Sequence, residues 1–175
     1  MARTRYVVEV SGLRQILNAL DETDKKASKE IQKKITTAAK SLAVEAGYIS
    51  PGSSPVSSWG TWWSSRDGRD LGFEPTRVAR GFKVQRNNFR RRGVSAGAGW
   101  DVYQSDAGGN IFEVMGDGSR VTTKSGERLV QTINRRFPAK QPRSLIPAYY
   151  RVVTPELKNE IRDAIIREAQ RLGLS

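Results

Sequence analysis

The sequence predicts an α+β fold, in which a small antiparallel β-sheet packs with a long N-terminal helix and a C-terminal helix and carries extended loops. Near both ends of the chain, apolar residues recur at the three- and four-residue spacing of a helical face. In the middle they alternate with polar residues, as in half-exposed strands. A length of 175 residues suffices for one hydrophobic core and is short for two, so we expect a single domain spanning 1–175.

The first elements predicted are a short strand and a long helix. Tyr6, Val8 and Val10 alternate with their neighbours in a run of β-forming residues, and Ser11 can cap a helix that follows. Apolar residues then keep a helical spacing, at Leu13, Ile16, Leu17, Leu20, Ile31, Ile35, Ala38, Leu42 and Ala46. We expect helix over most of 12–47, with a bend or an interruption in the charged stretch 21–29.

A Ser-, Gly- and Pro-rich insert at about 48–75 carries three tryptophans, Trp59, Trp62 and Trp63. A plain linker has no need of such residues. Two interpretations stay open at this point. The tryptophans either cover the edge of the domain's own core, since aromatic side chains bury large areas, or belong to an extended arm that docks on a neighbouring subunit.

The centre of the chain predicts the sheet. A period of two over 77–85 and again over 94–103 predicts two strands, which the turn-like segment 86–93 joins into a hairpin. Glycines flank the apolar run 111–115, which predicts a third strand.

The last part of the chain combines a long loop with a closing helix. Residues 116–143 predict a loop with a short helical piece near 127–136, and loops of that length usually serve contacts. Thr154 can cap the closing helix, Pro155 suits its first position, and an apolar face continues to Leu172 before Gly173 ends it.

The composition argues against an enzyme. Cysteine and histidine are both absent, which excludes thiolate nucleophiles, imidazole bases, disulfides and nearly every zinc or iron site. Gly93, Gly97 and Gly99 lack the Lys-Ser or Lys-Thr pair of a phosphate-binding loop, and Glu113 and Asp117 have no partner acid at a catalytic spacing. We therefore expect no catalytic residues, no cofactor and no metal.

The charge points to an anionic partner. Thirty Lys and Arg against 18 Asp and Glu leave a net charge of +12, which favours nucleic acid, anionic membrane or acidic protein surfaces. No apolar run approaches the ~20 residues that cross a bilayer, so we expect a soluble protein made in the cytoplasm. The predicted hairpin tip carries four arginines, which can grip either DNA phosphates or an acidic protein face: Arg86, Arg90, Arg91 and Arg92.

The order of these elements resembles a phage family. The resemblance is carried by residues 8–20, by the segment 111–116 (Ile-Phe-Glu-Val-Met-Gly), and by Leu-Ile-Pro-Ala at 145–148 with the helix to Leu172. Such an order is similar to the neck or tail-completion proteins of long-tailed double-stranded-DNA phages, also described as head-tail joining or minor tail proteins. This chain departs from the family where Pro51 leads into the Trp-rich insert instead of a Pro-Thr-Gly step, and in its long 116–143 segment.

The resemblance implies a structural virion protein in the neck, assembled in the host cytoplasm. It implies a homo-oligomeric ring, commonly six-fold, that joins the head connector or adaptor to tail terminator or tail-tube proteins around the DNA passage. The residues expected at the subunit interface are Trp59, Trp62, Trp63, Phe112 and Glu113, and the basic tip is expected to face DNA or an acidic connector surface. The alternative is a basic nucleic-acid-binding protein, such as a packaging or ribosome-associated factor, that acts directly on DNA or RNA.

Overall fold

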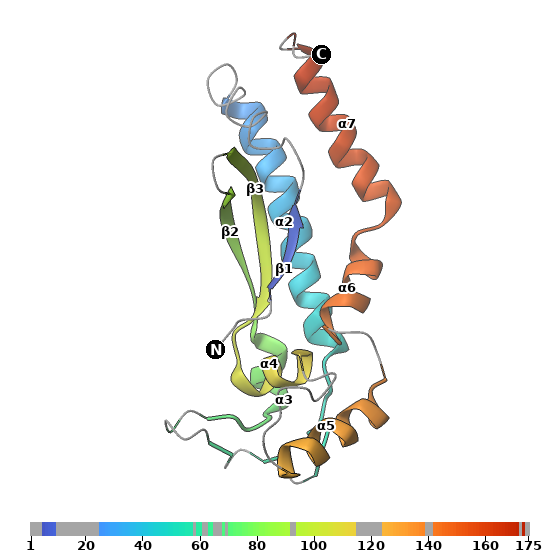
Figure 1. Ribbon diagram of the computed structural model, residues 1–175. Coiled ribbons are helices and arrows are strands. Elements are labelled where there is room, and N and C mark those ends of the chain that lie inside the picture. The colour runs from blue at the N-terminus through green and yellow to red at the C-terminus, as the bar shows by residue number, and fades with distance from the viewer. Residues whose placement is uncertain are drawn as a thin grey trace.

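The computed structural model describes residues 5–9, 25–57, 59–60, 63–64, 68, 70–91, 94–114, 124–138, 142–171 and 173. Its elements, in chain order, are β1 (Arg5–Glu9), α2 (Lys25–Ile49), α3 (Pro75–Arg80), β2 (Phe82–Arg91), β3 (Val94–Gln104), α4 (Ala107–Val114), α5 (Lys124–Arg136), α6 (Leu145–Val152) and α7 (Pro155–Arg171). The predicted α+β class, with a small antiparallel sheet between a long N-terminal helix and a C-terminal helix, is confirmed (Figure 1).

The sheet has three antiparallel strands in the order β1-β3-β2, so β3 is central. Trp100 of β3 lies opposite Val8 on one side and Arg86 on the other, and Val102 lies opposite Tyr6 and Val84. The predicted first strand and the predicted hairpin are both confirmed. Between Asn88 and Arg90 the register of β2 against β3 shifts, a bulge of the kind that bends a hairpin and increases its twist.

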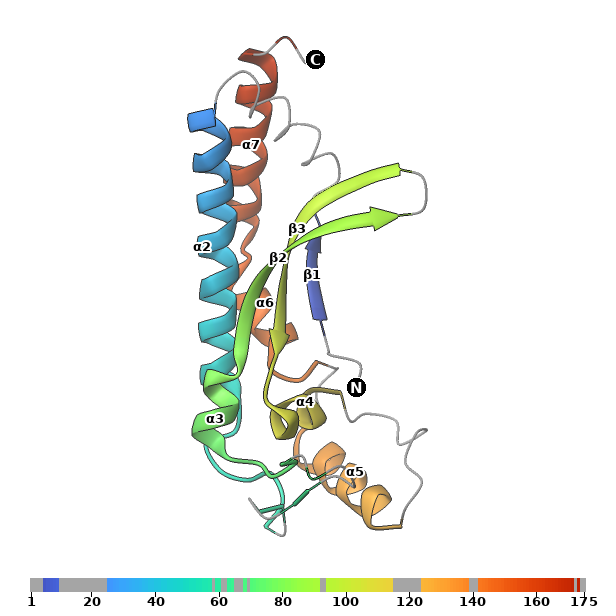
Figure 2. The same cartoon turned by 90° about the vertical axis from the view of Figure 1, so that its left-hand side faces the viewer.

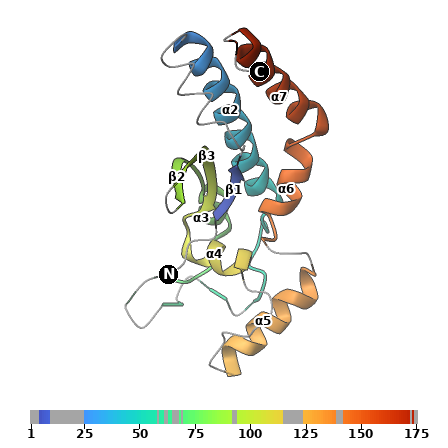
Figure 3. The same cartoon turned by 45° about the horizontal axis from the view of Figure 1, so that its top comes forward.

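Helix α2 covers one face of the sheet. One stripe of its residues is buried, at Ser28, Ile31, Ile35, Ala39, Leu42, Ala43 and Ala46. This stripe packs on Phe82, Trp100 and Val102 of the sheet, and α6 and α7 add Leu145, Ala148 and Ile165 to the same core. Figure 3 shows α2, α6 and α7 side by side, with the strands to one side of them. The long helix is thus confirmed from Lys25 onward, while 10–24 lies outside the described residues.

A second core closes the end of the molecule opposite the C-terminus, where α3, α4 and α5 meet the insert (Figure 1). Its buried members come from four different segments, and they are Trp59, Phe73, Val78, Phe112, Leu129 and Ile133. The rings lie in succession, with centroid distances of 5.2 Å for Trp59–Phe73, 6.0 Å for Phe73–Phe112 and 5.3 Å for Phe112–Phe137. We name this part of the chain the aromatic base.

The strand predicted over 77–85 begins later than expected. Residues 75–80 form α3, because Glu74 caps it by accepting the N–H groups of Thr76 and Arg77, and Pro75 occupies its first turn. Only from Phe82 is the chain extended. Val78, which fitted the alternating pattern, is a buried helical residue of the aromatic base.

The third strand predicted over 111–115 is wrong, because Ile111–Val114 belongs to helix α4; Met115 lies outside the described residues. Asp106 initiates this helix by accepting the N–H of Gly109 with its carboxylate, at 2.8 Å, and that of Asn110 with its carbonyl, at 2.9 Å. A Cβ on Gly108 would lie 2.3 Å from the carbonyl oxygen of Gly72, so this close approach needs glycine. Of the two glycines that suggested a strand entrance, Gly108 packs α4 against the insert and Gly109 packs against the side chain of Gln104.

Two other helices follow the sequence closely. The predicted helical piece near 127–136 is α5, and the flanking segments 115–123 and 139–141 lie outside the described residues. For α7, the N–H of Leu157 donates to Thr154 Oγ1 at 3.3 Å, Pro155 begins the helix, and Gly173 has a φ of +68°. The predicted cap, start and stop of the closing helix are confirmed.

Candidate functional site

The structure places two of the insert tryptophans, Trp59 and Trp63, against the chain's own core. Trp59 is fully buried and its indole Nε1 donates to the carbonyl of Leu71 at 2.8 Å. Trp63 is half-buried and packs on the same cluster, while Trp62 lies outside the described residues. Of the two interpretations left open by the sequence, this geometry favours coverage of the domain's own core, and it leaves no free side chain at Trp59 for a neighbouring subunit.

Phe112 and Glu113, expected at a subunit interface, are also interior residues, with exposed fractions of 2% and 1%. Both carboxylate oxygens of Glu113 lie 3.1 Å from the N–H of Ser144, and one lies 3.4 Å from that of Leu145, at the start of α6. Burial raises the pKa of Glu113, and the hydrogen bonds from Ser144 and Leu145 and the charge of Arg143 oppose this rise. The carboxylate therefore serves to fix α4 against the first turn of α6.

Arg143, two residues before α6, connects α4 and α5. Its guanidinium donates to the carbonyls of Phe112 and Phe137 and to the side-chain oxygen of Asn134, and lies 5.5 Å from the centre of the Phe112 ring. Burial lowers the pKa of Arg143, and the nearby charge of Glu113 opposes this effect. All these contacts are internal, which indicates a structural role.

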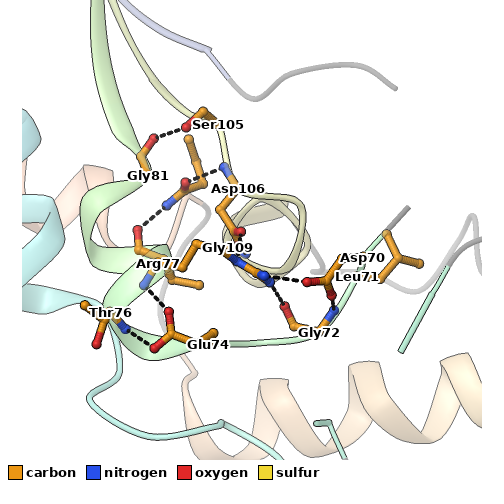
Figure 4. Close-up of polar contacts among 12 residues, drawn as sticks. Asp70, Leu71, Gly72, Glu74, Thr76, Arg77, Gly81, Ser105, Asp106 and Gly109 are labelled. Carbon is orange, nitrogen blue, oxygen red and sulfur yellow. Dashed lines mark hydrogen bonds and ion pairs between the residues drawn. The ribbon is translucent and has the colours of Figure 1, made fainter. Parts of the chain in front are cut away.

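A second polar network surrounds Arg77 (Figure 4). Its guanidinium pairs with Asp70 and Asp106 and donates to the carbonyl of Gly72 at 2.8 Å. The hydrogen bond to Asp70 raises the pKa of Arg77 and lowers that of Asp70. Beside it, buried Gln104 donates to the carbonyl of Val78 and accepts the N–H of Asp106. The network joins the insert, α3 and the β3–α4 junction.

In both networks the carboxylates bind backbone N–H groups or a cation of the chain itself. Within the described ranges, no group of three or more Asp, Glu, His or Cys is placed to hold a metal ion. None of the helices in that same part of the chain is long and apolar enough to cross a membrane.

Three of the predicted basic residues lie in the paired strands of the β2–β3 hairpin and not in a turn. Figure 2 shows its outer half curving away from α2 and projecting from the body. Arg90 lies opposite Ser95 and Arg91 opposite Val94, so both belong to paired strand, and Arg92 lies outside the described residues. Arg86 is exposed, donates to Gln32 Oε1 of α2 at 2.9 Å, and lies 5.9 Å from the centre of the Trp100 ring. The predicted 86–93 turn is therefore mostly strand.

The first half of α2 adds lysines at the same end of the molecule as the hairpin tip (Figures 1 and 2). Its exposed cations are Lys25, Lys26, Lys29, Lys33 and Lys34, against one acid, Glu30. Lys34 is paired with Glu160 of α7 at 2.6 Å. We name the basic end as Arg86, Arg90 and Arg91 of β2 together with Lys25, Lys26, Lys29 and Lys33 of α2. Sequence reasoning missed the lysines, although their excess in the first turns of a helix was visible.

A third feature is an exposed helical face. Val44 and Tyr48 of α2 are 58% and 81% exposed, and lie one turn apart on the same side of the helix. Tyr150 of α6 is 75% exposed, and its neighbour Arg151 pairs with Glu45 of α2 at 2.8 Å. Along α2 toward its N-terminus, a groove of about 620 Å³ opens between α2 and α7, lined by residues that include Thr37, Ser41, Val152 and Leu157. We call these exposed side chains and the groove the helical face.

Comparisons with protein-family models, with curated proteins and with solved structures found no match to this chain.

Proposed function

We propose that this chain is a structural virion protein of the phage neck, which forms a ring that joins the head connector to the tail around the DNA passage. The observation that carries the proposal is the helical face, where Val44, Tyr48 and Tyr150 are large apolar or aromatic side chains left in water. Tyrosine is enriched at protein interfaces because it combines a large contact area with a polar tip. A groove beside these residues offers a concave surface to a neighbour.

The sheet supports the same proposal. In the described part of the chain, β1 and β2 each pair with β3 alone, so each has one edge with backbone groups open to another strand. Strand addition and helix packing are two common ways for one subunit to complete another. In a closed ring each interface is heterologous, so the helical face of one subunit meets a different surface of the next.

The interface expected from the sequence changes accordingly. Trp59, Phe112 and Glu113 stabilise the aromatic base, so their substitution would destabilise the subunit itself and reveal little about assembly. The proposed contacts to neighbouring subunits are instead made by the helical face. The outer partners proposed for the ring remain the head connector or adaptor on one side and tail terminator or tail-tube proteins on the other.

Assembly is tested by mass photometry and negative-stain electron microscopy of the purified chain, alone and mixed with the adaptor and tail proteins encoded beside it. Tyr48→Asp together with Tyr150→Asp should abolish ring formation and leave the far-ultraviolet circular dichroism unchanged. The matched control is Val114→Ser, which removes an exposed apolar side chain, 45% exposed, from α4. Rings formed equally well by the double variant would contradict a role for this face, and a monomer under every condition would contradict the function.

The second candidate is a basic nucleic-acid-binding protein that acts alone on DNA or RNA, which the basic end favours. A chain that stays monomeric at all concentrations, yet binds nucleic acid with a steep salt dependence, would support this candidate over the ring.

A further inference from the structure

We infer that the basic end is a binding surface for the phosphate backbone of double-stranded DNA. The inference rests on the proposed function, in which the DNA is the duplex that passes through the neck. To that function it adds a surface defined by its residues and a partner defined by its chemistry. Three features support it, which are the shape of the hairpin, its contact with α2, and the excess of cations over acids at this end.

The charge of the hairpin is of one sign. Residues 82–100, which span β2, the turn and most of β3, hold five cationic side chains and no acidic one. Four of the five, Lys83, Arg86, Arg90 and Arg91, lie on β2 itself. Guanidinium groups suit phosphates particularly well, because their planar array of donors can contact two oxygens at once.

The shape of the hairpin suits a nucleic-acid duplex. It is a two-stranded ribbon that projects from the body (Figure 2), and ribbons of this kind are of a size that the major groove admits. Arg90 lies opposite Ser95, and from Ser95 to Gly99 β3 has only small residues, which let another backbone approach closely. From Arg86 to Arg91 the strand extends about 17 Å, at ~3.3 Å per residue, which matches about five base-pair steps of ~3.4 Å.

The junction with α2 makes the strand and the helix one surface. The hydrogen bond of 2.9 Å from Arg86 to Gln32 ties β2 to α2 between Lys29 and Lys33. Lys25, Lys29 and Lys33 recur every four residues and therefore lie on neighbouring positions of one side of the helix. Cations from two elements thus lie at the same end of the molecule and meet where Arg86 contacts α2, while the outer half of the hairpin extends away from the helix (Figure 2).

DNA fits this surface better than an acidic protein does. The centres of protein interfaces are apolar and poor in charge, with aromatic anchors that exclude water. From Gln85 to Arg91 the strand has a single apolar residue, Phe89, so it lacks such a centre. A phosphate backbone needs no apolar anchor, because release of counterions drives the binding. Backbone contacts of this kind do not read sequence, which is what a passage for a whole genome requires.

The test is fluorescence anisotropy with two unrelated DNA duplexes of equal length, titrated with the full chain from about 50 to about 200 mM salt. The two duplexes should bind equally. Arg90→Ala with Arg91→Ala should weaken binding about tenfold at the lower salt, and the slope of log Kd against log salt should fall by about 1.8, since each phosphate contact contributes about 0.9. Arg90→Lys with Arg91→Lys keeps both charges and should bind within a few-fold of wild type.

The matched control is Arg128→Ala with Arg135→Ala. It removes two exposed cations from α5, at the opposite end of the molecule from the hairpin tip (Figure 1), and lowers the net charge by the same two units. An equal loss of affinity in this control would overturn the inference, because net charge alone would then explain binding. So would wild-type affinity in the Arg90/Arg91 alanine variant, or binding of polyglutamate without binding of DNA.

Ring formation by the same variants is measured separately, by mass photometry without DNA. Rings that do not bind DNA would refute the inference and leave the assembly proposal intact. DNA binding by a chain that never forms rings would support the DNA-binding surface and refute the ring. Should the double alanine variant lose its fold, as judged by circular dichroism, the single variants Arg90→Ala and Arg91→Ala decide the question, because each should lower the salt slope by about 0.9.

Discussion

The two ends of the molecule use their cations in opposite ways. At the aromatic base, Arg77 pairs with Asp70 and Asp106, and Arg143 donates to carbonyls beneath the Phe112 ring. At the basic end, lysines and arginines outnumber acids, and the described ion pair of α2 in this region, Lys34–Glu160, is exposed. Cations at the base hold segments of the chain together, whereas those at the basic end leave a surface that attracts anions.

The two ends should also differ in whether their residues contribute to the stability of the fold or to binding. A base built from insert, α3, α4 and α5 has buried rings whose loss leaves a cavity. At the basic end, the lysines of α2 are exposed, so they can change with little effect on folding. Substitutions at the two ends should therefore give opposite patterns of stability and binding.

The largest effect is expected for Trp59→Ala in the aromatic base. Trp59 is fully buried and its indole N–H binds the Leu71 carbonyl, so the variant loses packing and leaves a buried acceptor unpaired. We expect a loss of about 3–5 kcal/mol in the free energy of unfolding, measured by urea denaturation. Tyr48→Ala, which truncates an aromatic that is 81% exposed, is the control and should change stability by less than about 0.5 kcal/mol. Similar values for both variants would contradict the assignment of Trp59 to the core.

The next largest loss of stability is expected for Glu113→Ala. This variant leaves the N–H groups of Ser144 and Leu145 without their acceptor, and it removes the opposite charge near Arg143. We expect a loss of about 3 kcal/mol, again from urea denaturation. Glu113→Gln keeps one acceptor oxygen and should lose less. An alanine variant as stable as the glutamine variant would show that the carboxylate does not hold α6.

The same residue predicts a pH dependence. Since burial raises the pKa of Glu113 in the folded chain above the ordinary 4.5, the folded state holds this proton more tightly than the unfolded state does. Its contribution to stability is fully present below pH 4.5 and declines as pH rises through the folded pKa. Glu113→Gln stays neutral, so its stability relative to wild type should increase over that range. Urea denaturation of both proteins at a series of pH values checks this, and a constant difference would contradict it.

A smaller effect is expected for Arg77→Ala, whose side chain is 39% exposed and whose ion pairs are therefore partly screened by solvent. We expect a loss of about 1–2 kcal/mol, because the insert would lose its links to α3 and to Asp106. The thermal unfolding midpoint measures this, with Arg162→Ala on the exposed face of α7 as the control. No difference between the two variants would show that the Arg77 network contributes little.

The smallest stability effect is expected for the double alanine variant of Arg90 and Arg91, within about 0.5 kcal/mol of wild type, because charged residues of a projecting hairpin seldom contribute more. Combined with the weakened DNA binding described above, this would sharpen the contrast between the two ends. A large loss of stability would instead assign the arginines a part in holding the hairpin.

Elements with strong local signals could be predicted from the sequence alone. The closing helix follows from Thr154, Pro155 and Gly173, and the hairpin from the alternation that ends at Tyr103. By contrast, the alternating pattern at Val78 and the apolar run at Ile111 are short, and short apolar runs fit a strand or a helix equally well. The capping groups Glu74 and Asp106 were present in the sequence and would have favoured helix at both places.

The candidate surfaces divide in the same way. The arginines of β2 could be found from the sequence because a charge run is visible wherever it folds. The contact of β2 with α2 could not be predicted from the sequence, because the Arg86–Gln32 hydrogen bond joins residues that are 54 positions apart. The helical face was missed since Val44 and Tyr48 look like ordinary members of an apolar helix until the side that packs on the sheet is known.

By itself, then, the sequence determined the fold class, the closing helix, the hairpin and the sign of the charge, all of which depend on neighbouring residues or on composition. Tertiary structure alone decided that Trp59 and Glu113 are interior, that 111–114 is helical, and which cations share one end of the molecule. The physical reason is that capping and periodicity act over a few residues, whereas burial depends on contacts between segments far apart in the chain.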